Sequence, residues 1–452
     1  MVHRYRFQGS CFAIDVNSGS VHVLDELTYE LLEYLKDPFP EELPKELLLN
    51  LNYDLEEVKE AYGELYILFQ NGLLFSKEQV PNKSYEWGLK IPIKSACLHV
   101  SHNCDLRCKY CFAGTGAFGG ERATMSLEVG KLAIDFLLRR SLQQENIEVD
   151  FFGGEPLLNF EVVKEVVKYA RAQEEKTGKR FRFTLTTNGR GLDSERISYI
   201  NCEMANVVLS IDGRKEVTDR LRVDANGSGC YDEILPKFKD LVVKRGGKNY
   251  YVRGTFTKLN LDFVKDIRHL VKEGFKEISF EPVVLNVRSP YAITKNDLAQ
   301  IFMEYENLAK EMVWSKQRGD DFNFFHFGII GKDAPCLSKR IKGCGAGVEY
   351  VAVTPEADIY PCHQFVGRKE YVMGNLKDGT FDIGKQAQFA GINISKKSKC
   401  KNCWGKLYCG GGCHANNVLL GGDFFEPYDI SCELLKKRLE CAIWVSAELA
   451  SR

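Results

Sequence analysis

The sequence predicts an α/β protein built around a partial (β/α)6 barrel, with a small unit before the barrel and a cysteine-rich region after it. Between residues 95 and 315, six runs of β-prone apolar residues alternate with amphipathic helical runs, which is typical of a parallel sheet with right-handed helical crossovers. The first 80 residues instead place short strands before helices. From about residue 325, cysteine, glycine and short strands replace the alternation.

The N-terminal unit, assigned to residues 1–80, is predicted to be a small sheet followed by helices. Its elements are strands at 5–7, 11–15 and 20–24, helices at 25–35 and 54–69, and a closing strand at 73–75. An exposed edge of such a sheet can accept an extended peptide as an additional strand, although a plain packing domain fits the pattern equally well. Residues 81–94 are assigned as a linker.

The barrel is assigned to residues 95–320 and the C-terminal region to residues 321–452. The predicted barrel strands are 96–100, 147–152, 181–187, 207–211, 250–257 and 277–284, and the helices are 127–140, 160–175, 194–201, 231–244, 261–272 and 294–314. Catalytic groups of such a barrel belong on the loops that follow the strand ends.

Composition limits the classes of protein and partner. The formal net charge of −1 over 452 residues argues against electrostatic capture of nucleic acid or an anionic membrane surface, and Lys396, Lys397 and Lys399 are expected in a solvated loop. The sequence shows neither a signal-peptide core nor a membrane span, which predicts a cytoplasmic protein. In that reducing compartment, sixteen cysteines indicate metal binding rather than disulfides.

Three cysteines follow the first barrel strand at short spacing. Cys104, Cys108 and Cys111 supply three ligands of a 4Fe–4S cluster and leave one iron open to another ligand. The alternative is a structural zinc site completed by His99 or His102. Six further cysteines have no assigned ligand role and are expected to be small core residues. They are Cys11, Cys97, Cys202, Cys230, Cys336 and Cys441. Of these, Cys336 is the one whose core role is most open to question.

A glycine pair and an acid follow the second strand. Gly153 and Gly154 allow close backbone approach to a ligand, and Glu155 can accept from an ammonium group. Together with the cysteine loop, this pattern resembles the radical S-adenosylmethionine enzymes. The resemblance implies that S-adenosylmethionine binds the open iron and yields a 5′-deoxyadenosyl radical. It also implies cofactor contacts for six residues: Tyr110 with adenine, Gly153, Gly154 and Glu155 with the amine, Ser210 with the nucleoside, and Arg222 with the carboxylate. The alternative for Arg222 is a surface ion pair with Asp219 or Asp224.

The C-terminal cysteines form a second constellation that resembles the SPASM domain, although Ala357 replaces a glycine usual in its turn. The resemblance implies two auxiliary 4Fe–4S clusters, and therefore three in all. Cys400, Cys403, Cys409 and Cys432 would close one, and Cys344, Cys362 and Cys413 would hold the other. Cys336 completes that second cluster, or its open site receives a substrate thiolate. A zinc ribbon is the alternative for this region.

His363 directly follows Cys362, at a position where sulfatase-maturing relatives carry an acid that acts as a base. A proton-transfer role for His363 is the catalytic hypothesis, and a structural role is its alternative.

Before such a barrel, the N-terminal unit resembles the winged-helix-like, PqqD-like recognition element of peptide-modifying enzymes. The whole chain resembles most closely the SCIFF maturases of six-cysteine peptides, the thermocellin type. This resemblance implies a cysteine-rich precursor peptide bound through its leader, a reductant such as ferredoxin or flavodoxin, and a thioether from a Cys sulfur to an α-carbon such as that of Thr. Sulfatase-type formylglycine formation, another peptide cross-linking chemistry, and a non-enzymatic iron–sulfur electron carrier or peptide chaperone remain alternatives.

Overall fold

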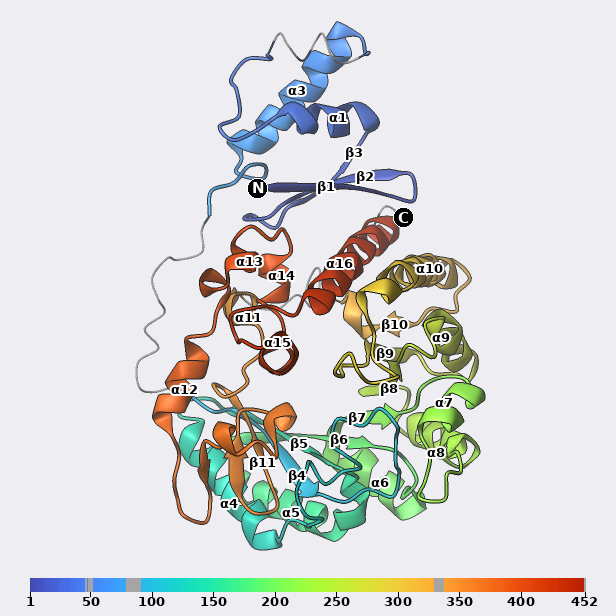
Figure 1. The fold of residues 1–452 in the computed structure, drawn as a ribbon, viewed down its shortest axis with the longest axis vertical. Coiled ribbons are helices and arrows are strands. Elements are labelled where there is room, and N and C mark those ends of the chain that lie inside the picture. The colour runs from blue at the N-terminus through green and yellow to red at the C-terminus, as the bar shows by residue number, and fades with distance from the viewer. Residues whose placement is uncertain (45–46, 48–51, 79–90, 329–336, 451–452) are drawn as a thin grey trace.

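A computed structural model describes residues 1–44, 47, 52–78, 91–328 and 337–450. The chain forms three tiers along its long axis (Figure 1). The N-terminal unit lies at one end, the barrel at the other, and a layer of C-terminal helices lies between them. Within the described ranges, no helix is long and apolar enough to cross a membrane.

The N-terminal unit pairs three antiparallel strands in the order β1–β2–β3 and covers them with helices. Its elements are β1 (Val2–Phe7), β2 (Ser10–Asp15), β3 (Val21–Leu24), α1 (Glu26–Tyr34) and α3 (Leu55–Gln70). Asp25 begins α1 by accepting a hydrogen bond from the backbone N–H of Thr28 at 2.7 Å, the usual way an N-cap side chain satisfies a first-turn donor.

The closing strand expected at 73–75 is wrong. These residues form a bend, because Phe75 has a φ of +49°, which is incompatible with an extended strand. The segment is instead held by Asp15, whose carboxylate accepts a hydrogen bond from the backbone N–H of Ser76 at 3.0 Å. The edge of β3 therefore has no backbone strand partner within residues 1–44 and 52–78.

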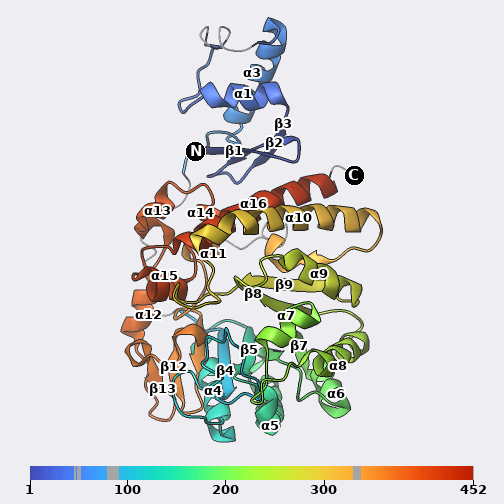
Figure 2. The same cartoon turned by 45° about the vertical axis from the view of Figure 1, so that its right-hand side comes forward.

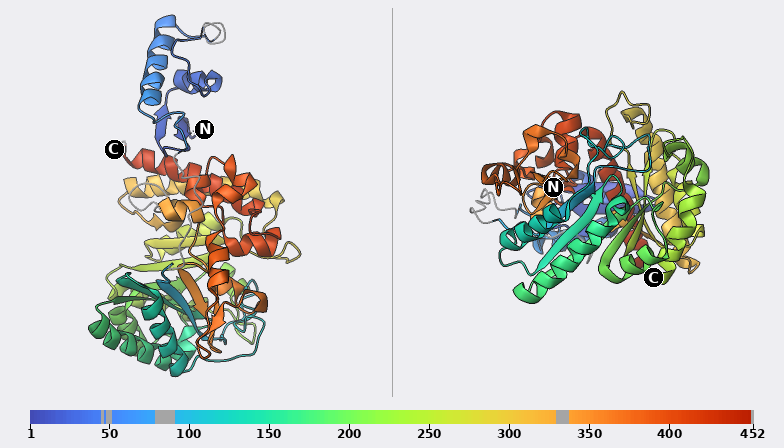
Figure 3. Two further views of the ribbon diagram at one scale, coloured as in Figure 1. Left: turned by 90° about the vertical axis from the view of Figure 1, so that its left-hand side faces the viewer. Right: turned by 90° about the horizontal axis from the view of Figure 1, so that it is seen from below.

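The barrel region is a parallel sheet whose helices cover its outer face, as the predicted fold class requires (Figure 3). Its strands are β4 (Ser95–Ser101), β5 (Asn146–Gly153), β6 (Arg180–Thr187), β7 (Met204–Ser210), β8 (Tyr250–Phe256), β9 (Glu277–Pro282) and β10 (Asn323–Phe324). Its helices are α4 (Leu127–Arg140), α5 (Phe160–Thr177), α6 (Ser194–Glu203), α7 (Lys215–Leu221), α8 (Tyr231–Lys244), α9 (Phe263–Lys272) and α10 (Leu298–Gln317).

Residue alternation explains the two faces of this sheet. On β5, Ile147, Val149 and Phe151 are fully buried in the core beneath the helices, and the residues between them face the opposite, inner side. Because a strand turns successive side chains to opposite faces, the inner face carries the more polar set, including Asp150. Parallel pairing brings the ends of these strands, and the loops after them, to one edge.

The C-terminal region extends the barrel sheet, which the sequence did not indicate. β11 (Tyr350–Val353) pairs in parallel with β4, and β12 (Asp358–Tyr360) and β13 (Gly374–Asn375) follow in antiparallel order. Ala357, in the turn between β11 and β12, has a φ of +76°. The turn thus keeps the left-handed conformation that favours glycine, even though alanine stands there.

Helices make up the rest of the C-terminal region. They are α11 (Leu337–Lys342), α12 (Ile383–Ala390), α13 (Ser398–Lys401), α14 (Lys406–Cys409), α15 (His414–Gly421) and α16 (Asp429–Ala450). α16 packs along α10 between the barrel and the N-terminal sheet (Figure 2). The sheet contacts α16 through the ring of Phe7, 5.2 Å from that of Trp444 between centroids. The ring of His3 stacks on Trp404, in the turn before α14, with 3.9 Å between centroids.

The six cysteines without a ligand assignment divide three ways. Cys11, Cys97, Cys230 and Cys441 are buried, as expected of core residues. Cys202 is exposed on α6, so the expectation is wrong there. Cys336 and most of the linker assigned to residues 81–94 lie outside the described residues.

Candidate functional site

The three-cysteine loop lies at the end of β4, directly against the turn that follows β5. The backbone N–H of Gly154 donates to the Ser101 carbonyl at 2.7 Å, and the N–H of Glu155 donates to the Asn103 carbonyl at 2.9 Å. Cys104, Cys108 and Cys111 are each partly buried in this loop. The loop that carries the thiols is therefore held against the glycine turn by two backbone hydrogen bonds.

Only glycine fits at both positions of this turn. A Cβ added at Gly154 would lie 2.3 Å from the Asn103 carbonyl oxygen, and one at Gly153 would lie 2.3 Å from that of Ser101. Gly153 also has a φ of +125°, a conformation that side chains rarely adopt. The glycine pair is therefore explained by its contact with the cysteine loop, whatever ligand it also approaches.

Glu155 joins the turn after β5 to the end of β6. Its Oε1 accepts hydrogen bonds from Leu157 N (3.1 Å) and Thr187 Oγ1 (2.7 Å), and its Oε2 accepts one from Asn188 N (2.8 Å). Burial raises the pKa of Glu155 to about 7, and these hydrogen bonds oppose the rise. Since each carboxylate oxygen has two acceptor positions, one position on Oε2 remains for a ligand amine.

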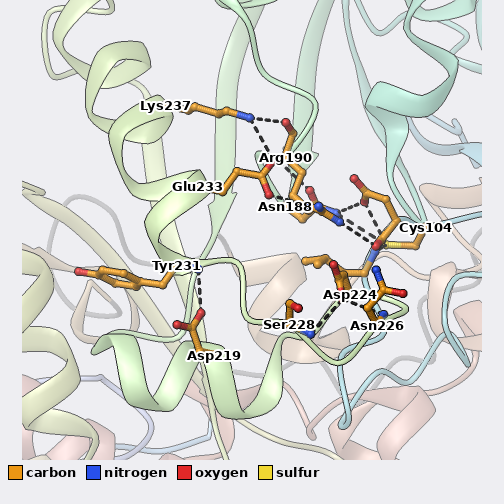
Figure 4. Close-up of polar contacts among 12 residues, drawn as sticks. Cys104, Asn188, Arg190, Asp219, Asp224, Asn226, Ser228, Tyr231, Glu233 and Lys237 are labelled. Atoms are coloured by element: carbon orange, nitrogen blue, oxygen red, sulfur yellow. Dashed lines mark hydrogen bonds and ion pairs between the residues drawn. The ribbon is translucent and has the colours of Figure 1, made fainter.

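Asn188 carries this connection to the first cysteine. Its side-chain amide donates to Asp105 Oδ1 at 2.7 Å and lies 3.7 Å from Cys104 Sγ. Figure 4 shows Asn188 and Cys104 turned toward each other from the segments that follow β6 and β4. Asn188 was not among the residues predicted from the sequence, although its position directly after β6 was the available signal.

Tyr110, Asp212 and Arg222 form a buried polar group beside the loop. The Tyr110 hydroxyl donates to Asp212 Oδ2 at 2.6 Å, and Arg222 Nη1 donates to the Tyr110 oxygen at 3.0 Å. Arg222 Nη1 lies 3.9 Å from Asp212 Oδ1. The buried Nε of Arg222 has no hydrogen-bond partner among the described residues, so this N–H suits an added anionic group such as a ligand carboxylate.

The alternative that pairs Arg222 with Asp219 or Asp224 is wrong. The Asp219 carboxylate accepts from the backbone N–H of Tyr231 at 2.8 Å, and that of Asp224 accepts from Ser228 N at 3.0 Å (Figure 4). Backbone pairing explains where Arg222 lies. Residues 106–109 pair with residues 221–224 through two hydrogen bonds, Arg107 N to Val223 O at 2.6 Å and Lys109 N to Leu221 O at 2.9 Å.

Ser210, the remaining predicted cofactor contact, is the last residue of β7. It is partly buried and lies in register with Arg253 of β8. The strand end thus places Ser210 at the same edge of the sheet as the cysteine loop and Glu155.

The seven C-terminal cysteines separate into two electrostatic groups. Burial raises the pKa of Cys432 to about 12, and Cys409, Cys400 and Cys403 add to the rise. Burial likewise raises the pKa of Cys362 to about 12, with further contributions from Cys344 and Cys413. These neighbours are the same quartet and trio that the SPASM resemblance implies.

The zinc alternatives rest on His99 and His102 beside the three-cysteine loop and on the C-terminal cysteines. In residues 91–328 and 337–450, no three His, Cys, Asp or Glu side chains are close enough to share one metal ion. His99 and His102 contact each other, with 3.1 Å between Nδ1 and Nε2.

Lys397 lies between the two cysteine groups, so its expected place in a solvated loop is wrong. Its side chain is fully buried, and Nζ donates to the Gly411 carbonyl at 2.6 Å. Burial lowers its pKa, and Cys400, Cys409, Cys344 and Cys432 oppose that change. Lys396 and Lys399 are exposed, as expected. A buried ammonium beside several thiols offsets the negative charge that ligand thiolates would bring.

His363 stands at the start of the turn after Cys362, facing the cysteine loop. Its Nδ1 lies 3.3 Å from the Tyr350 hydroxyl, and its ring packs near Phe112 and Phe152. Burial lowers the pKa of His363 to about 4, and Arg253 adds to the effect. The imidazole is therefore neutral near pH 7, and its lowered pKa makes it a weaker base than a free histidine.

Two family models match the chain at these two places. A model described as a 4Fe-4S single cluster domain matches residues 94–229. The SPASM model, an iron-sulfur cluster-binding domain, matches residues 344–404. The first contains Cys104, Cys108, Cys111 and Glu155, and the second contains Cys344, Cys362, Cys400 and Cys403.

Relatives of known identity share the same architecture. The chain is 24% identical over 336 residues to the cysteine-type anaerobic sulfatase-maturating enzyme of Clostridium novyi, covering 70% of this chain and 86% of that one. The structure of anSMEcpe with bound AdoMet and Kp18Cys peptide matches with a TM-score of 0.65 and 22% identity, covering 79% of this chain and 99% of that one. Streptococcus suis SuiB bound to precursor peptide SuiA matches with a TM-score of 0.55 and 16% identity, covering 95% and 98%. At these identities, the structural matches establish the fold.

Replacing Gly154 with alanine tests the contact between the turn and the loop. The new Cβ would meet the Asn103 carbonyl, so Gly154→Ala should displace the cysteine loop and remove about four iron atoms per chain after anaerobic reconstitution. Gly120→Ala is the matched control, because its Cβ would meet only the Ala117 carbonyl, at 3.5 Å. Iron analysis measures both, and equal iron in the two variants would contradict the packing argument.

Proposed function

The chain is a radical S-adenosylmethionine protein with a SPASM domain, and from this premise we propose that it is a peptide maturase. The observation that carries the proposal is the convergence of three thiols, one remaining acceptor position on Glu155 and the unpartnered Nε of Arg222 on one strand edge. Bound to a cluster on those thiols, S-adenosylmethionine supplies a 5′-deoxyadenosyl radical that removes a hydrogen atom from the substrate. Glu155 and Arg222 hold the amine and carboxylate, and Tyr110 and Ser210 hold the nucleoside.

The N-terminal unit supports a peptide as the substrate. β3 is an edge strand, and Val23 on it is 62% exposed, so an extended leader can add to the sheet there. Of the two peptide-bound structures compared above, SuiB with its precursor peptide matches 95% of this chain, which includes most of the first 80 residues. The sulfatase-maturase structure matches 79%.

The chemistry we propose is a thioether between a Cys sulfur and an α-carbon of a cysteine-rich peptide. Cys344, Cys362 and Cys413 group together among the described residues, and we propose that their cluster receives a substrate thiolate. Cys336, which lies outside the described residues, is the alternative fourth ligand. The quartet would close the third cluster. For each thioether the α-carbon loses a hydrogen atom, the thiol loses a proton, and the surplus electron passes to the auxiliary clusters, while an external ferredoxin or flavodoxin supplies the electron that starts the reaction. His363, which directly follows Cys362, is the residue that we propose to receive the thiol proton.

Formylglycine formation on a sulfatase is the second candidate, favoured by the similarity to the Clostridium novyi enzyme. Two features of this chain weigh against it. His363 stands where an acid is expected for that chemistry, and the N-terminal sheet has no evident use for a sulfatase substrate. The products distinguish the candidates, because a thioether lowers the peptide mass by two hydrogens per bond and formylglycine formation from cysteine removes the sulfur.

Reductive cleavage of S-adenosylmethionine tests the enzyme class. Reconstituted protein with dithionite should release 5′-deoxyadenosine, and Cys104→Ala should abolish the release because two thiols cannot hold the cluster. Cys202→Ala is the matched control, since this exposed thiol on α6 is outside all three groups. Chromatography of the nucleoside measures both, and no release from fully reconstituted wild-type protein would refute the radical assignment.

Leader binding is tested separately on the β3 edge. With a cysteine-rich peptide encoded beside the gene, Val23→Asp should reduce peptide modification about tenfold or more, because a charge opposes an added apolar strand, while 5′-deoxyadenosine release persists. Val243→Asp is the control, because Val243 is also an exposed valine (76%) but lies on α8. Mass spectrometry of the peptide measures the effect. Equal modification by the two variants would show that this edge does not bind the leader.

A further inference from the structure

The inner face of β8 and β9 carries a polar group that none of the predicted contacts uses. On β8, Tyr250, Val252 and Phe256 are buried in the core beneath the helices, and Arg253 lies on the opposite face, where it is exposed. On β9, Ser279 is in register with Arg253, and Glu281 follows on the same face. His326, in the turn after β10, and Arg438, on α16, complete the group.

Glu281 is already engaged within this group. Its Oε1 lies 3.1 Å from His326 Nδ1 and 3.7 Å from Arg438 Nη1. His326 Nε2 lies 3.0 Å from Ser279 Oγ. Burial lowers the pKa of His326 to about 4, with Arg438 and Arg253 adding to the effect and Glu281 opposing it. The imidazole is therefore neutral, donating from Nδ1 to Glu281 and accepting from Ser279.

The group carries an excess of positive charge. It contains two guanidiniums and one carboxylate, and Arg438 has a buried Nε without a hydrogen-bond partner among the described residues. Among the residues that the structure describes, no carboxylate oxygen lies within 4.0 Å of a nitrogen of the Arg253 guanidinium. An exposed arginine without an ion-pair partner, beside a carboxylate held by other groups, is suited to bind an added carboxylate.

Arg253 also stands at the level of the candidate active site. It is in register with Ser210 on β7, the predicted nucleoside contact, and Arg438 of the same polar group lies on α16 of the C-terminal region. An anion on Arg253 would therefore lie between the predicted nucleoside contact and the C-terminal region, where the proposed peptide must pass.

We propose that Arg253 forms a carboxylate-binding subsite on the inner face of the barrel, which pairs with an acidic group of the substrate peptide. His326 and Arg438 are positioning residues, because they hold Glu281 and so keep it from pairing with Arg253. The assignment of the ligand to a peptide rests on the proposed function. The binding of a carboxylate by Arg253 does not require cleavage of S-adenosylmethionine.

Ligand-observed NMR titration of the full-length reconstituted protein tests this subsite with three probes. Acetyl-Gly-Asp-Gly-amide carries a side-chain carboxylate, acetyl-Gly-Asn-Gly-amide lacks one, and acetyl-Gly-Gly-Gly with a free C-terminus carries only a terminal carboxylate. We expect an acidic probe to bind about tenfold more tightly than the Asn probe, as a charge-assisted hydrogen bond provides. The preferred acidic probe identifies the source of the carboxylate.

Variants assign the binding to Arg253. Arg253→Gln should abolish the preference for the acidic probe, and Arg253→Lys should retain part of it, since lysine keeps the charge but loses the fork of donors. Arg182→Gln is the matched control, an exposed arginine near the start of β6 on the same inner face. Arg438→Met should weaken acidic binding, because it frees Glu281 to approach Arg253.

Three results would overturn the subsite: equal binding of the acidic and Asn probes, no measurable binding of either acidic probe, or the same loss in Arg182→Gln as in Arg253→Gln. Failure of the proposed function has a different signature. In that case the wild-type protein releases no 5′-deoxyadenosine, while its preference for the acidic probe and the effect of Arg253→Gln are unchanged.

Discussion

The contact between the three-cysteine loop and the Gly153–Gly154 turn is the constraint on which the site depends. It is fixed by two backbone hydrogen bonds, to the carbonyls of Ser101 and Asn103, and leaves no room for a Cβ at either glycine. Glu155 then extends the connection to β6 through Thr187 and Asn188. A buried carboxylate is costly unless hydrogen bonds satisfy it, so these donors are a requirement of the arrangement. Three neighbouring strand ends are thereby held as one unit.

The same edge is reached from the other end of the chain. β11 pairs in parallel with β4, and His363, which follows the returning strand β12, packs its ring near Phe112 of the cysteine loop and Phe152 of β5. Cys432 and Arg438 lie on α16, which packs along α10 on the other side of the site. The barrel therefore supplies one wall of the site and the C-terminal region the other, and Lys397 lies buried between the two cysteine groups of that second wall.

Periodicity was sufficient to predict most of the barrel. The helices 127–140 and 231–244 have the predicted bounds, because their apolar spacing and end residues are local signals. The contacts that place the site are not local. Arg222 depends on backbone pairing of 221–224 with the cysteine loop, and Arg253 acquires its neighbours from β9, the turn after β10 and α16. Such contacts join segments far apart in sequence, so hydrophobic pattern alone could not reveal them.

The sequence predictions that were wrong for Lys397 and for residues 73–75 also failed for physical reasons. Lys397 sits in a run of basic residues that is typical of a solvated loop, yet the Gly411 carbonyl and the surrounding thiols make a buried ammonium acceptable there. The strand expected at 73–75 has the apolar composition of a strand, but the backbone turns at Phe75 so that Ser76 can bond to Asp15. In both places a tertiary partner, absent from the local sequence, decided the outcome.

The central claim is that the thiols of Cys104, Cys108 and Cys111 hold a cluster whose remaining iron binds S-adenosylmethionine through its amine and carboxylate. The most direct measurement is electron–nuclear double resonance on the reduced protein with S-adenosylmethionine labelled with ¹⁵N at the amine and ¹⁷O at the carboxylate. Both labels should show hyperfine coupling to the cluster spin. A reduced cluster on these three cysteines that shows coupling to neither label would contradict this claim.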